Sequence, residues 1–308
     1  LAHTLGIPFD IDQVLSIAEK YDLWVIEDNC DALGAEYSLQ RTYRLKGGLE
    51  ISGTRKTGTF GHIGTSSFYP AHHITMGEGG AVYTMDTTLH RILLSLRDWG
   101  RDCWCDPGTD ATCSKRFSWK LGKLPEGYDH KYTYSHLGYN LKITDMQAAI
   151  GCAQLKKAER FVMARRDHWE HLRNGLKMLQ EQFVLPSAPP QSLVSPFGFA
   201  LSVRNHARFT RDAITAHLEQ NHIQTRTVFA GNMLRQPALV DTTVRLRIGS
   251  GDLLASTDLD EQHYALLPNT EFVMNNTFWI GVYPGLKPEM LDYIIRQIRE
   301  FVADRQKD

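Results

Sequence analysis

An amphipathic stretch that leads directly into a short apolar run places the tightest limit on the fold of this chain. The pattern predicts a helix over Ile11 to Tyr21 and a buried strand over Asp22 to Asp28. A helix followed at once by such a strand is typical of α/β proteins with parallel sheets. Further buried strands are expected at Ser66 to Tyr69 and Ala81 to Thr84. Because Asp28 ends its strand, we expect its carboxylate at the sheet edge where such proteins bind ligands.

The second half of the chain carries signals for a smaller domain. Thr144 or Asp145 is expected to cap a long helix that reaches about Leu179, and Ser187 to Pro190 is typical of a linker. We therefore expect a large domain over residues 1–165 and a small C-terminal domain over residues 166–308. The other expected elements are a helix that Asp86 caps, strands at 198–203, 225–229 and 277–282, and helices at 210–219 and 288–302.

Two stretches look inserted, Glu36 to Arg55 and Ile248 to Leu267. The first carries arginine, lysine and glycine without a pattern of buried positions, so we expect an exposed loop. Surface loops accept insertions at a small entropic cost.

Composition indicates an ordinary globular protein. Of 308 residues, 42% are apolar, and the net charge of −1 offers no field that favours nucleic acid or a membrane surface. No apolar run approaches the roughly 20 residues needed to cross a bilayer. Five cysteines without the pattern of a disulfide framework suit a reducing compartment, so we expect a cytoplasmic protein.

The run from Ser67 to Gly80 is the most specific motif. It reads Ser-Phe-Tyr-Pro-Ala-His-His-Ile-Thr-Met-Gly-Glu-Gly-Gly and resembles the active-site segment of the pyridoxal phosphate (PLP) sugar aminotransferases of the DegT/DnrJ type. In that family a lysine carries the cofactor as a Schiff base, whereas this chain has His72 at the lysine position. An imidazole cannot form that imine, but it can transfer protons near neutral pH. The substitution resembles the sugar 3-dehydrases of dideoxysugar biosynthesis.

This resemblance implies a fold of the aspartate-aminotransferase type (PLP fold type I). Such a fold has a large α/β domain with a mainly parallel sheet, followed by a small C-terminal α+β domain. The family also has a long segment before the position of Leu1, so we expect an N-terminally truncated chain. The segment Gly-Tyr-Asn-Leu around Asn140 is similar to one that reaches the cofactor phosphate of a neighbouring subunit, which implies a homodimer.

The resemblance also assigns roles to single residues. Asp28 would keep the pyridine nitrogen protonated and so make the ring an electron sink. Asp31 would lie near the ring hydroxyl, Ser67 would bind the phosphate, and His72 would act as the base. The plain alternatives are a helix cap for Asp28, a core strand position for Ser67 and a turn cap for Asn140.

Three clustered cysteines form a second motif. Cys103, Cys105 and Cys113 have the spacing C-x-C-x7-C, and Cys30 follows the strand that ends in Asp28. These thiols either pack in a reduced core or, as four thiolates, hold an iron–sulfur centre. Beside His72 they resemble the [2Fe–2S] branch of the sugar 3-dehydrases. In that interpretation Cys30 is the fourth ligand and Trp104 covers the cluster, whereas Cys152 only packs inside a helix.

The implied cofactor is pyridoxamine phosphate (PMP), held without a covalent link. The implied substrate is CDP-4-keto-6-deoxyglucose, whose C3 hydroxyl leaves during dideoxysugar and lipopolysaccharide O-antigen biosynthesis. A flavin-containing iron–sulfur reductase would supply the electrons. Arg226, Asn232 and Arg235 are candidates to bind the pyrophosphate, because a guanidinium can bind it in two places; a solvated surface position is their alternative.

Two other functions are left open. One is a cluster-free 3-dehydrase, or an aminotransferase-like protein, that regenerates its cofactor with glutamate. The other is a catalytically silent, truncated chain that serves as a dimerisation or binding module.

Overall fold

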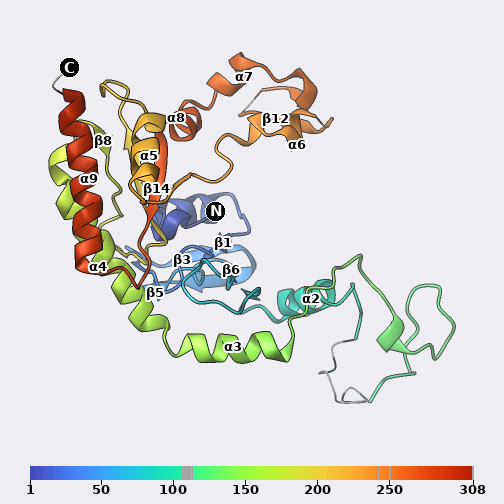
Figure 1. The fold of residues 1–308 in the computed structure, drawn as a ribbon. Coiled ribbons are helices and arrows are strands. Elements are labelled where there is room, and N and C mark those ends of the chain that lie inside the picture. Colours follow the sequence, from blue (N-terminus) through green and yellow to red (C-terminus); the bar gives the residue numbers. More distant parts are fainter. Residues whose placement is uncertain (104, 106–111, 113, 242, 250, 307–308) are drawn as a thin grey trace. The chain divides into compact units, whose positions relative to one another are not determined.

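The chain forms two compact units, drawn as a ribbon in Figure 1. The computed structural model describes residues 1–103, 105, 112, 114–241, 243–249 and 251–306. The first unit comprises Leu1–Thr4, Pro8–Glu159 and Pro189–Leu193, and the second comprises Leu5–Ile7, Arg160–Ala188 and Val194–Asp308. The main part of the first unit ends at Glu159, slightly before the boundary expected after residue 165.

A three-stranded sheet forms the centre of the first unit, with strands in the order β1 (Ile26–Asp28), β6 (Ile63–Ser67) and β7 (Gly80–Tyr83). Strand β1 pairs in parallel with β6, and β7 pairs antiparallel with β6. A further parallel bridge joins Ala2 to Asp28. The α/β class is therefore confirmed, and the carboxyl ends of β1 and β6 lie at one sheet edge.

Strand β1 is shorter than the sequence pattern predicts, because His62 takes the place of a strand partner. The backbone N–H of Val25 donates to Nδ1 of His62 over 3.0 Å. Nε2 of the same ring bonds to the carbonyl oxygen of Lys46 over 2.9 Å. His62 thus joins the segment before β1 to the inserted stretch.

Helix α1 (Ile11–Lys20) is specified by its cap and its apolar face. The Asp10 carboxylate accepts a hydrogen bond from the N–H of Gln13 over 3.0 Å, and so satisfies one donor that a helix start leaves unpaired. Ile11 and Leu15 are buried in the core of the first unit. The local signals of capping and periodicity are therefore sufficient to fix this helix.

The expectation of an exposed loop over residues 36–55 is wrong. The stretch forms four short strands, and the side chains of Tyr37, Tyr43, Leu45 and Ile51 are buried in the same core as α1. Strand β2 lies between β5 and β9 in one sheet, and β3 pairs with β4 in a hairpin. The bounds are β2 (Glu36–Ser38), β3 (Tyr43–Leu45), η2 (Lys46–Gly48), β4 (Leu49–Ile51), β5 (Thr54–Lys56) and β9 (Ser192–Leu193).

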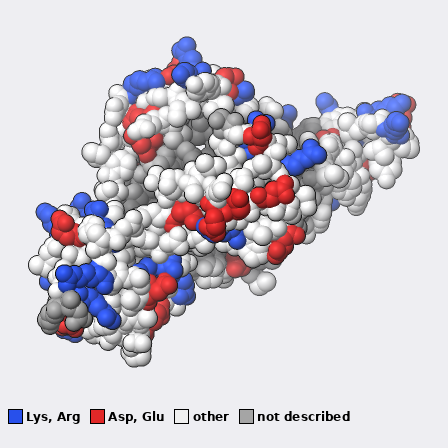
Figure 2. Space-filling view, turned by 90° about the horizontal axis from the view of Figure 1, so that it is seen from above, with Lys and Arg blue, Asp and Glu red and all other residues white. Residues whose placement is uncertain are grey.

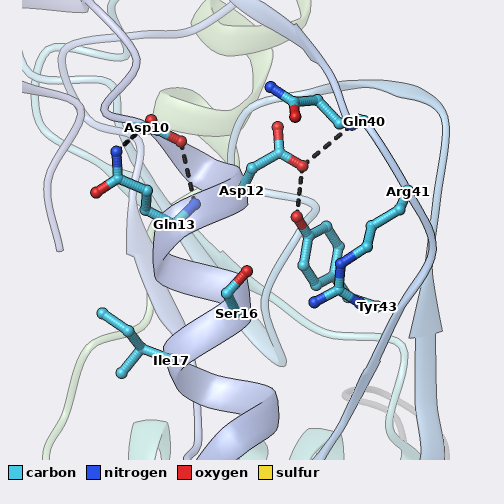
Figure 3. Close-up of a pocket in the computed structure, with 8 residues that line it drawn as sticks. All are labelled: Asp10, Asp12, Gln13, Ser16, Ile17, Gln40, Arg41 and Tyr43. Atoms are coloured by element: carbon cyan, nitrogen blue, oxygen red, sulfur yellow. Dashed lines mark hydrogen bonds between the residues drawn. The ribbon is translucent and has the colours of Figure 1, made fainter.

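A buried carboxylate fastens the inserted stretch to α1. Figure 3 shows Oδ1 of Asp12 accepting hydrogen bonds from the N–H of Gln40, over 3.0 Å, and from the hydroxyl of Tyr43, over 2.6 Å. The Arg41 guanidinium lies 3.9 Å from the centroid of the Tyr43 ring. The pocket in this view contains none of the residues that the sequence assigned to cofactor chemistry. We therefore attribute these contacts to stability.

Replacing Tyr43 with phenylalanine should lower the free energy of unfolding by about 1–3 kcal/mol, because a buried carboxylate then loses a hydrogen-bond donor. Urea unfolding measures the change. The control is Tyr21→Phe, since Tyr21 is exposed and its hydroxyl should contribute little. Equal stability of the two variants would contradict the fastening role of Asp12.

The long helix expected after Thr144 is interrupted. Thr144 caps α3 (Asp145–Leu155) in a capping box, and a separate helix, α4 (Ala158–Leu176), follows. Between them the N–H of Lys157 bonds to the carbonyl of Gln154 over 2.8 Å, which is the tighter three-residue spacing that commonly ends a helix. The expected cap at Asp86 is confirmed, and begins α2 (Thr87–Arg97).

The second unit packs helices on an antiparallel sheet of order β11-β14-β10-β8. Its core includes residues of α4, α5, α9 and the sheet, and the elements expected from the sequence are present within a few residues. The bounds are β8 (Phe183–Val184), β10 (Gly198–Val203), α5 (Arg211–Gln220), β11 (Thr225–Thr227), α6 (Pro237–Val240), β12 (Arg245–Arg247), β13 (Leu253–Ala255), α7 (Glu261–Ala265), α8 (Pro268–Asn276), β14 (Thr277–Gly281) and α9 (Pro288–Gln306). Shorter turns of the second unit are η4 (Lys177–Leu179), η5 (Met233–Arg235) and η6 (Ser256–Asp258); η3 (His130–Tyr132) belongs to the first unit, and η1 (Thr4–Gly6) has residues of both.

Charged side chains of both signs are interspersed over the described part of the face in Figure 2, without a broad basic area there. This distribution agrees with the nearly neutral net charge. Among the described residues, every helix is too short or too polar to cross a membrane.

Candidate functional site

The carboxyl ends of β1 and β6 bring together side chains that the sequence assigned to a cofactor. Asp28 is in register with Thr65, whose hydroxyl donates to Oδ1 of Asp28 over 3.3 Å. Ser66 is buried and its hydroxyl is 3.2 Å from that of Tyr83. Because side chains alternate along a strand, Ser67 lies on the same face of β6 as Thr65. One face of this sheet edge therefore presents Asp28 and Ser67 together.

Hydrogen bonds keep Asp28 ionised. Burial alone would disfavour its charged form, but hydrogen bonds from Cys30 and Thr65 outweigh that effect and hold the pKa of the carboxyl below its usual value. The backbone N–H of Cys30 lies 3.0 Å from Oδ1. Asp28 is thus an anion at neutral pH, as a group that holds a protonated ring nitrogen must be.

His72 lies in the loop after β6, against the carboxylate of Asp31. Nε2 of His72 is 3.2 Å from Oδ1 of Asp31, and each side chain is 13% exposed. On another side, the ring of Tyr69 meets the imidazole edge-to-face with centroids 5.0 Å apart. The expected position of Asp31 near the ring hydroxyl of the cofactor stays a prediction; the structure adds its contact with His72. A carboxylate at one imidazole nitrogen fixes the orientation and tautomer of the ring.

The other cofactor candidates differ in their surroundings. The hydroxyl of Ser67 accepts a hydrogen bond from the N–H of Tyr69 over 3.4 Å. Asn140 is exposed, and its backbone forms an isolated bridge with Asp98. His73, the residue after His72, is buried. Ser67 thus lies at the same sheet edge as Asp28, and Asn140 lies on a different segment with its side chain accessible.

Two of the expected cluster ligands, Cys103 and Cys105, lie beside a histidine that was not among the candidate ligands. The thiols of Cys103 and Cys105 and a ring nitrogen of His130 lie within 4.8 Å of one another. The sequence interpretation missed His130, because no spacing rule connects a distant histidine to a C-x-C motif. Cys113 and Trp104 lie outside the described residues.

Cys30, the expected fourth ligand, lies at the sheet edge that carries Asp28. Its sulfur is 3.9 Å from the hydroxyl of Thr65, and burial, followed by the nearby Asp28, raises the pKa of the thiol to about 12. Among the described residues, the group of possible metal ligands around Cys103 does not include it. Cys152 is exposed, so the expectation that it packs inside a helix is wrong.

The three substrate candidates belong to the second unit. Nη2 of Arg235 lies 2.6 Å from Glu261 and 2.8 Å from Glu271, and the two carboxylates raise its pKa. Asn232 is buried and donates to Glu271 over 2.7 Å. Arg226 is exposed and donates to a neighbouring backbone carbonyl. The guanidinium of Arg226 is thus more accessible than that of Arg235, whose charge is balanced by carboxylates of the same unit.

Comparison with known proteins relates this geometry to a family. The profile of the DegT/DnrJ/EryC1/StrS aminotransferase family matches residues 1–299. The chain belongs to the DegT/DnrJ/EryC1/StrS aminotransferase family. Solved structures with the same fold include the E. coli GDP-4-keto-6-deoxy-D-mannose-3-dehydratase with bound hydrated PLP, at a TM-score of 0.71 and 23% identity, covering 96% of this chain and 65% of that one.

Relatives of this DegT/DnrJ/EryC1/StrS member include enzymes of nucleotide-sugar metabolism. The chain is 50% identical to dTDP-4-dehydro-2,6-dideoxy-D-glucose 3-dehydratase of Saccharopolyspora spinosa, covering 98% of this chain and 58% of that protein. It is 49% identical to the lipopolysaccharide biosynthesis protein RfbH of Salmonella typhimurium, covering 98% and 62%. The chain therefore spans about three fifths of the length of these relatives.

The donor set of this family member fits a non-covalently held PMP. An ionised Asp28 suits the ring nitrogen, the hydroxyl of Ser67 suits a phosphate, and His72 occupies the position where a covalent link would need lysine. These residues would hold the cofactor without a covalent link.

Proposed function

We propose that the chain carries the catalytic residues of a PMP-dependent nucleotide-sugar 3-dehydratase that removes the C3 hydroxyl of CDP-4-keto-6-deoxyglucose. The contact between His72 and Asp31 carries this proposal, because it puts an oriented proton-transferring group where aminotransferases have the cofactor-binding lysine. The 50% identity to a protein named a sugar 3-dehydratase supports it. We propose CDP as the nucleotide of the substrate because the His72 and cysteine motifs resemble those of the [2Fe–2S] sugar 3-dehydrases.

Each residue of the site has a defined task in this reaction. Bound PMP supplies an amine for the 4-keto group and a ring that accepts electrons. Asp28 would keep the ring nitrogen protonated, and Ser67 would bind the phosphate together with Asn140 of the partner subunit in a homodimer. His72 would move the proton at C4′ of the cofactor, and Asp31 would hold the imidazole in position for that transfer.

Arg226, supported by Asn232 and Arg235, is proposed to bind the pyrophosphate of the nucleotide sugar. The guanidinium of Arg226 is exposed, so it can bind a phosphate without first breaking an ion pair. The network of Asn232 and Arg235 with Glu271 would fix the segment that follows Arg226.

Deoxygenation at C3 consumes two electrons and two protons and releases water, so the enzyme needs a reductant. We assign this role to a flavin-containing iron–sulfur reductase that delivers electrons to a [2Fe–2S] cluster. Cys103, Cys105 and Cys113 would hold the cluster, and Cys30 is the fourth cysteine that the sequence offers. We place the reaction in the cytoplasm, where thiols stay reduced. Iron and acid-labile sulfide analysis separates this enzyme from a cluster-free relative that uses glutamate.

Replacing Asp31 with asparagine should reduce turnover by roughly 10²-fold, the lower end of what a positioned general base contributes, since the imidazole then loses the group that fixes its orientation. PMP affinity should change little. The rate under single-turnover conditions measures the effect on catalysis, and the ¹⁵N chemical shifts of His72 report the tautomer of its ring. An unchanged tautomer and an unchanged rate would show that Asp31 does not orient the base.

A further inference from the structure

The indole of Trp279 is held flat against the sheet of the second unit. Its N–H donates to the carbonyl of Thr227, at the end of β11, over 3.0 Å. The other end of the indole lies over Gly198 at the start of β10, where a Cβ atom would come within 2.5 Å of Cε3 of the ring. The ring of Phe197 packs beside the indole, with centroids 5.2 Å apart. Contacts with both neighbouring strands therefore fix the orientation of Trp279, and the missing side chain of Gly198 makes room for it.

Trp279 points away from the core of the second unit. Phe278 and Ile280, the residues before and after it on β14, are buried in the core together with the helices. Because side chains alternate along a strand, Trp279 lies on the opposite face of the sheet, where it is half-buried. One face of the indole rests on the backbone at Gly198, so the other face is the one available for a contact.

An exposed cation lies next to this aromatic ring. Arg226 is directly opposite Trp279 in the antiparallel pair of β11 and β14, and side chains of such a pair lie close together on one face of a sheet. The guanidinium of Arg226 donates to the carbonyl of Thr225 over 3.0 Å, whereas two carboxylates hold that of Arg235. Flat aromatic side chains stack on nucleobases, and a guanidinium binds phosphate oxygens in two places. The two neighbouring side chains are thus suited to the two ends of a nucleotide.

We propose that Trp279 is the platform on which the base of the nucleotide sugar stacks, beside the pyrophosphate at Arg226. This inference rests on the proposed function for the role of Arg226 and for cytosine as the base. Stacking tolerates different bases, because every base has a flat π-face. The platform therefore contributes affinity for the nucleotide and does not itself select cytosine.

Calorimetric titration of the PMP-loaded protein with CDP tests the platform. Trp279→Leu should weaken CDP binding by roughly 10- to 100-fold, the usual effect of losing one stacked aromatic. Trp279→Phe keeps a stacking surface and should retain most of the affinity. Titration with inorganic pyrophosphate should give the same affinity in Trp279→Leu as in wild-type protein, because that probe has no base.

Two glycines supply a matched pair of variants that leave Trp279 in the chain. Gly198→Ala should weaken CDP binding as Trp279→Leu does, because the added methyl group displaces the indole. Gly281 is the partner of Gly198 in the strand pair, and a Cβ atom there meets no other atom within 4 Å. Gly281→Ala should therefore bind CDP as the wild-type protein does. Retained absorbance of bound PMP in each variant shows that the chain is folded.

The outcomes separate this inference from the proposed function. Equal CDP affinity in wild-type and Trp279→Leu protein would overturn the platform and leave the proposed 3-dehydratase intact. Wild-type protein that binds dTDP or GDP in place of CDP, with the same loss in Trp279→Leu, would support the platform and change the nucleotide of the proposed function. Wild-type protein that retains PMP but binds none of the three nucleotides would contradict both.

Discussion

Replacing His72 with asparagine should reduce turnover by about 10²–10⁴-fold, the usual contribution of a general base. Asparagine keeps a polar side chain of similar reach but cannot accept the proton at C4′ of the cofactor. PMP should stay bound, because Asp28 and Ser67, rather than a covalent link, are proposed to hold it. Turnover at saturating substrate and PMP binding by equilibrium titration measure the two effects separately.

A matched control is His90→Asn, since His90 lies exposed on α2. That variant should behave as the wild-type protein does. A further variant, His72→Lys, restores the residue that aminotransferases use and should trap the cofactor covalently and favour transamination. Unchanged turnover in His72→Asn protein would remove His72 from the mechanism.

Replacing Cys103, Cys105 or Cys113 with serine, one at a time, should abolish reductase-dependent turnover and deplete the protein of iron. Each change removes a thiolate from the proposed cluster, and a serine hydroxyl is a poor substitute for a soft iron ligand. For Cys103 and Cys105 the structure supplies a reason beyond spacing, since both thiols lie beside His130. Iron per chain and the rate of product formation with the reductase are the measurements.

Cys152→Ser is the matched control for the cluster variants. Cys152 is exposed on α3, so its replacement should leave iron content and turnover unchanged. Iron at the wild-type level in Cys105→Ser protein would contradict the assignment of the cluster, whatever the activity of that variant.

Elements specified by neighbouring residues could be predicted from the sequence. Thr210 caps α5, Pro288 begins α9, and the apolar strand β10 was expected over the residues that form it. Capping, periodicity and turn residues act within a few positions of one another, so a single sequence is sufficient to show them. The strand end that carries Asp28 was expected for the same reason.

The inserted stretch could not be predicted in this way. Arg44 separates Tyr43 from Leu45, and the charged residues around them conceal two buried positions at strand spacing. Their burial depends on α1, where Asp12 binds the hydroxyl of Tyr43 from 31 positions away. The pairing of His72 with Asp31 likewise depends on the fold, as does the position of His130 beside the cysteines. Long-range contacts of this kind leave no local signal.

Mass spectrometry of the nucleotide sugar, after incubation of the purified protein with PMP, the reductase and CDP-4-keto-6-deoxyglucose, tests the central claim most directly. We expect a product that has lost the oxygen at C3 and again carries a ketone at C4, formed only when the reductase is present. A sugar with an amino group at C4 would show an aminotransferase instead. An unchanged sugar, with PMP bound and the reductase active, would contradict the assignment of this chain as a 3-dehydratase.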